Sequence, residues 1–168
     1  MLNIQKDIPL APLTTFHIGG KADYFTETSD ISELAEALEY AAKLAVPVCV
    51  LGGGSNIIFP DKGFVGLIVK MCAGGMQITG EKISVGAGVP LFDVVRFASS
   101  AGLAGLERLA GIPGSLGGAI RGNAGAFGAV IGDRIVSVKV FTQANGIIKE
   151  LKNDACEFEY RTSIFKKN

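Results

Sequence analysis

Residues 48–56 have the sequence VCVLGGGSN, an apolar run that leads directly into three consecutive glycines. The apolar part has no polar position, which is typical of a short strand buried on both faces. Upstream, the sequence SDISE at residues 29–33 predicts the capped start of a helix that ends before Pro47. Residues 23–26 and 66–70 predict two further strands. The stretch is therefore part of a small βαββ-type unit that we expect to end near residue 70.

The glycine loop within this stretch does not match the two common nucleotide-binding fingerprints. A dinucleotide fold needs a third glycine where Ile57 stands, and no Gly-Lys-Ser/Thr follows as in a P-loop. What remains is a tight loop with up to about five clustered N–H donors, the Ser55 hydroxyl and the Asn56 amide, a set suited to phosphate oxygens. The alternative is a sharp turn that only needs positive φ, for which three glycines are more than required.

The pattern changes after residue 70. Residues 77–79 and 82–85 predict a hairpin, and a helix is expected to start at Pro90. Strands are expected at 135–142 and 147–151, joined by a turn at Asn145-Gly146. We therefore expect an α+β chain in two lobes, residues 1–70 and 71–168.

A second glycine-rich segment, GIPGSLGGAIRGNAGAFG, occupies residues 111–128. Six of its glycines recur every three or four residues, which predicts a glycine-faced helix: Gly111, Gly114, Gly118, Gly122, Gly125 and Gly128. A glycine inside a helix costs about 1 kcal/mol relative to alanine, so the bare face must be pressed against something. The glycine face would contact either another helix, through packing of small residues, or a ligand.

A large, flat ligand with a diphosphate suits both glycine-rich segments. Hydrogen bonds to a bare diphosphate contribute roughly 5–10 kcal/mol, which is comparable to the ~4–15 kcal/mol that association costs, so a diphosphate alone binds poorly. Burial of about 200 Å² of an aromatic ring system adds roughly 5 kcal/mol. A dinucleotide with a fused-ring head would use both segments, and FAD is the natural candidate.

Composition narrows the class of partner. The 168 residues include 16 Lys and Arg and 16 Asp and Glu, so the basic surface that nucleic-acid binding requires is not expected. No stretch predicts a membrane-spanning helix or a polybasic membrane patch. Three cysteines lie far apart without a CxxC pair, which excludes a zinc framework and favours a reducing, cytoplasmic location. We expect no metal and a small-molecule partner.

Four motifs occur in order along the chain: TTFHIGG at residues 14–20, LGGGSN at 51–56, GIPGS with GNAG between 111 and 125, and YRTSIF at 160–165. Together they make the chain resemble the UDP-N-acetylenolpyruvoylglucosamine reductases (MurB), flavoenzymes of peptidoglycan synthesis. The resemblance covers nearly the whole chain. It implies a two-lobed FAD-binding domain of the vanillyl-alcohol-oxidase/PCMH type, with residues 1–70 and 71–168 as its subdomains and the C-terminal substrate-binding domain absent.

The resemblance also implies the chemistry. NADPH would reduce FAD, and flavin N5 would give a hydride to C3 of the enolpyruvyl group of a UDP-sugar enolpyruvate. Protonation of C2 would then complete UDP-N-acetylmuramate. Arg161 matches the family's catalytic arginine, which stabilises the enolate-like charge as a fixed cation, and Tyr160 beside it is expected to help position substrate. Without the motif, Arg161 would be interpreted as a surface salt-bridge residue.

The resemblance assigns the cofactor to the two glycine-rich segments. The expected contacts are Gly52, Gly53, Gly54, Ser55, Asn56, Ile57, Gly111, Ile112, Pro113, Gly114, Ser115, Gly117, Gly118, Ala119, Asn123, Gly125 and Ala126.

The chain departs from the family at His17, where the family often has another residue and to which we assign no chemistry, and at its C-terminal end. The family's serine proton donor and final glutamate belong to a third domain, and the sequence stops at Asn168, so we expect this chain alone to be incomplete for turnover. Ser163 lies in the Tyr-Arg segment and Ala126 lacks a donor, so neither takes the missing role. Two alternatives remain: a non-catalytic flavin- or nucleotide-binding module acting through a partner, and another oxidoreductase of the same fold. The Tyr160-Arg161 motif argues against the second.

Overall fold

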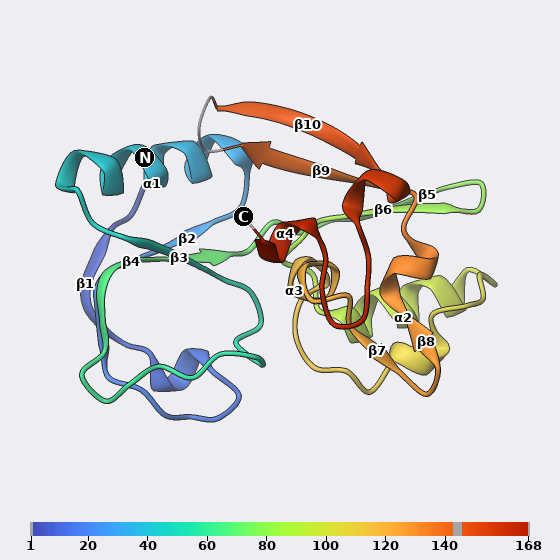
Figure 1. Cartoon of the computed structure of the whole chain (residues 1–168), viewed down its shortest axis with the longest axis horizontal. Helices are drawn as coiled ribbons and strands as arrows, with labels where there is room; N and C mark the ends of the chain where they lie inside the picture. The colour runs from blue at the N-terminus through green and yellow to red at the C-terminus, as the bar shows by residue number, and fades with distance from the viewer. Residues whose placement is uncertain (1, 143–145, 168) are drawn as a thin grey trace. The chain divides into compact units, whose positions relative to one another are not determined.

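The computed structural model describes residues 2–142 and 146–167, which form two compact units that divide between Ala73 and Gly74. Both units combine helices and strands (Figure 1). The predicted boundary near residue 70, as a division between two FAD-binding subdomains, stays a prediction. None of the helices in the two described ranges combines the length and apolar character that a bilayer crossing requires.

Unit 1 is built on a four-stranded sheet in the order β1-β2-β4-β3. The pair β1/β2 is antiparallel, whereas β2/β4 and β3/β4 are parallel. Its elements are β1 (Gln5–Pro9), the 3₁₀ turn η1 (Ala11–Leu13), β2 (Lys21–Thr28), α1 (Ile31–Leu44), β3 (Val48–Leu51) and β4 (Phe64–Met71). The predicted strand–helix–strand–strand order is confirmed, and β1 is an element that the sequence pattern missed.

Helix α1 begins as its capping pattern predicts. The Asp30 side chain accepts a hydrogen bond from the Glu33 N–H at 2.9 Å, and the Glu33 carboxylate accepts one from the Ser29 N–H at 2.7 Å. These reciprocal bonds satisfy amides that the first turn of a helix leaves unpaired. The helix buries Ala37 and Ala41 in a cluster with Leu67 and Val69 of β4, so it covers one face of the sheet.

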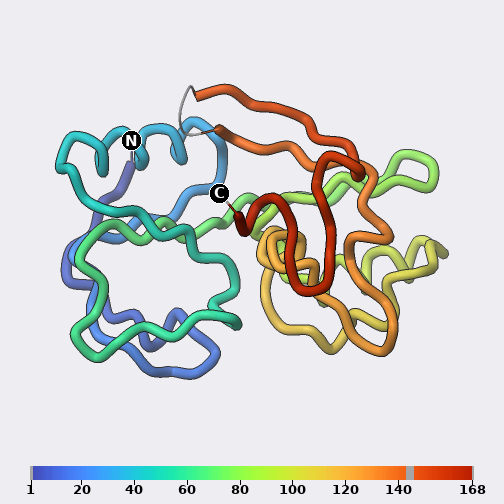
Figure 2. The backbone as a smooth tube through the Cα atoms, viewed as in Figure 1, coloured from blue at the N-terminus to red at the C-terminus, as the bar shows by residue number. Residues whose placement is uncertain are grey.

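The other face of the sheet is covered by loops. Ile68 of β4 lies in a second cluster with Leu10, Leu51 and Phe59. Two segments far apart in the chain, residues 10–20 and 52–63, lie side by side there (Figure 2). They are joined by hydrogen bonds from Thr15 N to Gly54 O and from Gly20 N to Pro60 O. The strand β4 is thus buried on both faces, and the position of the glycine loop follows from this packing.

Unit 2 contains short elements around a compact apolar cluster. They are β5 (Met76–Thr79), β6 (Lys82–Val85), α2 (Leu91–Ser100), η2 (Glu107–Leu109), α3 (Leu116–Arg121), β7 (Gly125–Ala126), β8 (Ala129–Val130), η3 (Ile131–Arg134), β9 (Ser137–Thr142), β10 (Ile147–Lys152), η4 (Asn153–Cys156) and α4 (Ile164–Lys167). The cluster brings together Leu91 and Val94 of α2 with Leu109, Leu116 and Ile131. The predicted hairpin β5/β6 and the helix after Pro90 are confirmed.

Two predictions for unit 2 need correction. The glycine spacing of residues 111–128 predicts one helix, but only Leu116–Arg121 is helical, and the rest forms turns and strand β7, whose partner β8 follows the segment. Turns also place glycines three or four residues apart, so the spacing alone could not distinguish the two. Strand β9 begins at Ser137 rather than at residue 135. Its antiparallel pairing with β10 is confirmed, while Asn145 of the predicted turn lies outside the described residues.

Candidate functional site

The glycine loop of unit 1, residues 52–57, follows β3 directly. Gly54 has φ +69°, and a Cβ added to it would lie 2.1 Å from the carbonyl oxygen of Leu13. An L side chain is therefore excluded by both the backbone conformation and the contact. Gly54 is therefore needed for packing within unit 1. This agrees in part with the alternative left open by the sequence, in which the glycines serve a sharp turn.

The amides of this loop have no acceptor within the part of the chain that the structure describes. Across residues 53–57 none of the backbone N–H groups donates a hydrogen bond to another described residue. The Ser55 hydroxyl also lacks a partner among the described residues, whereas the Lys70 ammonium group donates to the Gly52 carbonyl oxygen. A run of unpaired amides is the arrangement that binds phosphate oxygens. Lys70 was missed because nothing in the sequence links the end of β4 to the loop.

The amides of the second glycine segment are used differently. Ser115 is the N-cap of α3 and its hydroxyl accepts from the Gly118 N–H at 3.4 Å. The two amides between Ser115 and Gly118 are bonded as well. Leu116 N donates to Val89 O and Gly117 N donates to Ala87 O, both at 2.8 Å. The first turn of α3 therefore offers no unpaired amide to an anion.

Several glycines of this segment nevertheless have room for a side chain. A Cβ on Gly111 would meet no atom within 4 Å, and one on Gly118 would meet only the Ser115 hydroxyl at 3.5 Å. On Gly122 it would meet only the Gly118 carbonyl oxygen, at 3.6 Å. Among the described residues, no second helix presses on these glycines, so small-residue helix packing does not explain them. They leave a bare stretch of backbone on this unit.

Most of the other residues of unit 2 that were predicted to contact the cofactor pack or pair with neighbouring elements of the unit. Ala119 is part of the buried cluster, and Ile112 packs against it. Gly125 and Ala126 form β7, paired with Val130 and Ala129 of β8. Pro113 is exposed and Gly114 is half-buried beside it. The predicted contacts of unit 2 thus divide into bare backbone at Gly111 and Gly118 and a supporting layer, and Gly122 adds bare backbone that was not predicted as a contact.

The Tyr160-Arg161 pair lies at the tip of a tight turn. The turn is closed by hydrogen bonds from Glu159 N to Thr162 O at 3.1 Å and from Thr162 N to Glu159 O at 3.2 Å. Tyr160 is 89% exposed and the Arg161 side chain is also exposed, with φ +57°. A non-glycine residue in the left-handed region is strained, and such strain is often stored at functional sites.

Two lysines of α4 are bonded close to this turn. The Lys166 ammonium donates to the Arg161 carbonyl oxygen at 3.1 Å. The Lys167 ammonium pairs with the Glu157 carboxylate at 2.8 Å, and the hydrogen bond and charge of Glu157 raise the pKa of Lys167. This pair is half-exposed and contributes little to stability. The Arg161 guanidinium has no acidic partner among the described residues.

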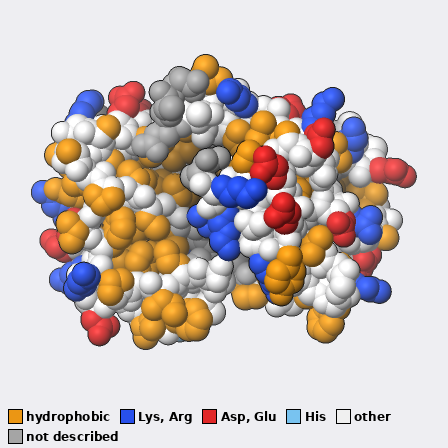
Figure 3. Space-filling model, in the orientation of Figure 1, with side chains coloured by type: hydrophobic (Ala, Val, Ile, Leu, Met, Phe, Trp, Pro, Cys, Tyr) orange, Lys and Arg blue, Asp and Glu red, His pale blue; other side chains and the backbone are white. Residues whose placement is uncertain are grey.

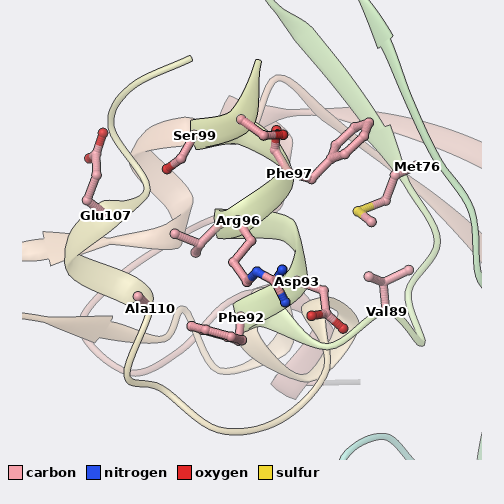
Figure 4. A pocket seen from close by; sticks show the side chains of 11 residues that line it. Met76, Val89, Phe92, Asp93, Arg96, Phe97, Ser99, Glu107 and Ala110 are labelled. Atoms are coloured by element: carbon pink, nitrogen blue, oxygen red, sulfur yellow. The ribbon is translucent and has the colours of Figure 1, made fainter. Parts of the chain in front are cut away.

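A hollow of about 680 Å³ lies beside α2 and contains none of the predicted site residues. Figure 4 shows Phe92, Asp93 and Arg96 along the helix, with Met76 and Val89 beside them. The Arg96 guanidinium lies 5.8 Å from the centre of the Phe92 ring. Among the described residues, no three His, Cys, Asp or Glu side chains are grouped to hold a metal ion.

Exposed apolar side chains also occur on unit 1. Figure 3 shows hydrophobic side chains gathered over this unit, and Phe16, Ile18 and Ile58 are among its exposed large apolar residues. They belong to the two loop segments that pack side by side. The patch lies outside the predicted contacts.

Comparison with known proteins places the chain in context. The FAD binding domain family matches residues 22–152. A UDP-N-acetylenolpyruvoylglucosamine reductase of Solibacter usitatus is 41% identical over 99% of this chain and 53% of its own length. The crystal structure of the corresponding reductase (MurB) from Thermus caldophilus superimposes with a TM-score of 0.83 at 31% identity, covering 97% of this chain and 57% of that chain.

A more distant structure shares the fold. That of 6-hydroxy-D-nicotine oxidase from Arthrobacter nicotinovorans has a TM-score of 0.70 at 19% identity, over 92% of this chain and 36% of its own. The expected α+β fold of the vanillyl-alcohol-oxidase type is thereby confirmed. The chain spans about half the length of the curated relatives it matches.

Proposed function

The chain belongs to the FAD binding domain family, and from this premise we propose that it is the flavin-binding part of a UDP-N-acetylenolpyruvoylglucosamine reductase. The substrate is then a small molecule, a UDP-sugar enolpyruvate, and NADPH is the hydride donor. We also propose a cytoplasmic location, on the ground that the three cysteines lie far apart in the sequence without a CxxC pair.

The observation that carries this proposal is the run of unpaired amides at residues 53–57. Unpaired backbone donors lose hydrogen bonds to water when a ligand covers them, so an occupant must supply acceptors. The diphosphate of FAD supplies acceptors and charge together. We assign that group to the glycine loop, Gly52, Gly53, Gly54, Ser55, Asn56 and Ile57.

The bare glycines of unit 2 support an assignment for the flat part of the cofactor. Gly111 and Gly118 have space where a Cβ would stand, and that space suits a ring system lying against the backbone. Ile112, Ser115 and Ala119 support this surface from the apolar cluster and the cap of α3. The residues of this chain therefore fit FAD.

When bound, FAD supplies the transfer of a hydride from NADPH to the enolpyruvyl carbon. The contribution of this chain to that reaction is a fixed positive charge. Arg161 is exposed and its guanidinium has no acidic partner among the described residues, so it is free to face an anion. It stabilises the negative charge that develops next to the carboxylate of the substrate. Tyr160, equally exposed on the same turn, contacts and orients the substrate.

Titration of the flavin-free 168-residue chain with FAD tests the cofactor assignment. Quenching of flavin fluorescence should report binding, ADP should compete for the site, and riboflavin should bind much more weakly because it lacks the diphosphate. A chain that stays flavin-free at saturating FAD would overturn the proposal.

Replacement of Arg161 tests the catalytic assignment in the protein at its full natural length. Arg161→Ala should lower kcat for enolpyruvyl reduction by about 10²–10³-fold, the usual effect of removing one stabilising group, while FAD affinity stays unchanged. Arg96→Ala, an exposed arginine on α2, is the matched control and should leave the rate unchanged. An Arg161→Ala variant with normal turnover would favour the alternative, a flavin-binding module without catalysis.

A further inference from the structure

The turn that presents Arg161 does not hold itself in place. It has two backbone hydrogen bonds, between Glu159 and Thr162, and one exposed bond from the Lys166 ammonium to the Arg161 carbonyl oxygen, and its tip is exposed to solvent. Arg161 adopts a left-handed backbone conformation, which a residue with a Cβ leaves readily when nothing opposes it. Some contact outside the turn must therefore determine its position.

Asn123 provides that contact from the end of α3. Its side-chain Nδ2 donates to the Glu159 carbonyl oxygen at 2.8 Å, and its Oδ1 accepts from the Gly132 N–H at 3.0 Å. One partner is only an acceptor and the other only a donor, so the orientation of the amide is unambiguous. Asn123 is 4% exposed, so water cannot easily replace either bond.

The surroundings of Asn123 are built closely around this amide. A Cβ on Gly132 would lie 2.9 Å from the Asn123 Oδ1 and 2.8 Å from the Phe158 ring, so only glycine fits there. The Gly132 carbonyl oxygen accepts in turn from the Asn153 side chain at 2.7 Å. A chain of hydrogen bonds thus runs from Asn153 through Gly132 and Asn123 to Glu159.

The other end of the turn is attached independently. Ser163, which is completely buried, donates its hydroxyl hydrogen to the Arg121 carbonyl oxygen at 2.7 Å. Both attachments lead to the C-terminal end of α3. Asn123 fixes the residue before the Tyr160-Arg161 pair, and Ser163 fixes the segment after it.

We infer that Asn123 is a positioning residue for Arg161, acting through the carbonyl oxygen of Glu159 rather than through the cofactor. The inference deepens the proposed function and rests on it for the role of Arg161. The Asn123 amide bonds to protein groups through one of its two N–H hydrogens and through its oxygen, and at 4% exposure it presents almost no surface to a ligand. Its importance for catalysis lies in where it places the guanidinium.

Two variants separate this role from general destabilisation. Asn123→Asp keeps the acceptor for the Gly132 N–H but replaces the donor to Glu159 by a second oxygen. Asn123→Gly removes both bonds and keeps the left-handed conformation at φ +42° accessible. If the buried aspartate prevents folding, the glycine variant still removes the contact with Glu159.

Limited digestion of the 168-residue chain with trypsin reports the position of the turn directly, because trypsin cleaves after Arg161. Both variants should increase the rate of cleavage at Arg161 by about tenfold, as expected when a buried hydrogen bond no longer opposes local opening. Cleavage after Lys62, an exposed residue of unit 1, is the internal reference and should not change. The inference would be overturned if both variants were cleaved after Arg161 at the wild-type rate, or if the rates after Arg161 and Lys62 increased equally.

Kinetics at full natural length test the consequence for the reaction. Asn123→Asp should lower the rate of enolpyruvyl reduction by at least about tenfold, because a small displacement of a catalytic group has effects of this size. Reduction of the flavin by NADPH, which develops no anion for Arg161 to stabilise, should be unchanged. Loss of both half-reactions together would indicate a structural role and overturn the inference.

Arg161→Ala separates failure of this inference from failure of the proposed function. If Arg161→Ala slows enolpyruvyl reduction and Asn123→Asp does not, the proposed function stands and the positioning role is wrong. If Arg161→Ala itself has no effect, the catalytic assignment fails, whatever trypsin shows at the turn.

Discussion

Loop 52–57 of unit 1 and segment 111–128 of unit 2 are both rich in glycine, yet their backbones are used in different ways. In the loop, Gly54 is held against Leu13 and the amides of residues 53–57 have no acceptor among the described residues. In the segment, the first amides of α3 are bonded within the unit, while Gly111 and Gly118 have room for a side chain. The first region offers hydrogen-bond donors and the second offers bare surface. Glycine content alone does not distinguish these uses; the partners of the amides do.

The largest expected effect comes from adding a methyl group where the loop is tightest. Gly54→Ala should lower the free energy of unfolding by about 3 kcal/mol or more, because it combines a strained φ with a backbone clash. Urea denaturation followed by circular dichroism measures this. Gly111→Ala, which adds the same methyl group in open space, is the matched control and should leave the stability almost unchanged. Equal losses in the two variants would remove the contrast between the regions.

The bare surface predicts an effect of the opposite kind. Gly118→Ala should stabilise the flavin-free chain by about 0.5–1 kcal/mol, because alanine is the better helix former. It should also weaken FAD binding by about tenfold, because the methyl group occupies space assigned to the ring system. Calorimetric titration with FAD and with ADP checks this, and ADP affinity should hardly change. Undiminished FAD affinity would mean that no ligand covers this backbone.

The donors of the loop predict a smaller loss that affects both ligands. Ser55→Ala removes a hydroxyl without a partner among the described residues, so the stability of the flavin-free chain should not change. FAD and ADP should both bind about fivefold more weakly, the effect of one hydrogen bond. The same titrations measure this, and a loss confined to FAD would contradict the assignment of the diphosphate to the loop.

The smallest expected effect concerns the turn that leads into segment 111–128. The Glu107 carboxylate accepts from the Gly105 N–H at 2.9 Å, and this bond, helped by the charges of Arg134 and Arg108, lowers the pKa of Glu107. A lowered folded-state pKa adds stability above the ordinary pKa of a glutamate, and that stability is lost as pH falls through the folded value. Acid titration of the melting temperature should therefore show a slightly weaker decrease below about pH 4 for Glu107→Gln than for the wild type. An identical decrease in both proteins would show that this bond makes no contribution.

Local patterns were sufficient where the interactions are local. The helix α1 was predictable because Asp30 and Glu33 satisfy amides within the same turn. The apolar run predicted strand β3 correctly, but the predicted burial on both faces was wrong: β3 is an edge strand and Val50 is 56% exposed, because β4 takes the buried position. The spacing of glycines in 111–128 misled because turns and helices share it, and only Leu116–Arg121 is helical.

The candidate site was predictable to a smaller extent. The motifs identified the glycine loop, the second glycine segment and the Tyr160-Arg161 pair. They could not reveal that the Lys70 side chain reaches Gly52, or that Asn123 bonds to Glu159 across 36 positions of the chain. No local signal exists for either contact, because each depends on how distant segments fold together.

The amino-acid sequence by itself determined the family motifs, the capped helix of unit 1 and the two places where glycine leaves the backbone bare. Tertiary structure decided which of those backbones keeps its amides unpaired, which glycine is required by packing, and which side chain holds Arg161 in place. The reason is physical. A hydrogen bond or a steric contact is defined by two partners, and when the partners are far apart in the chain only the fold determines whether they meet.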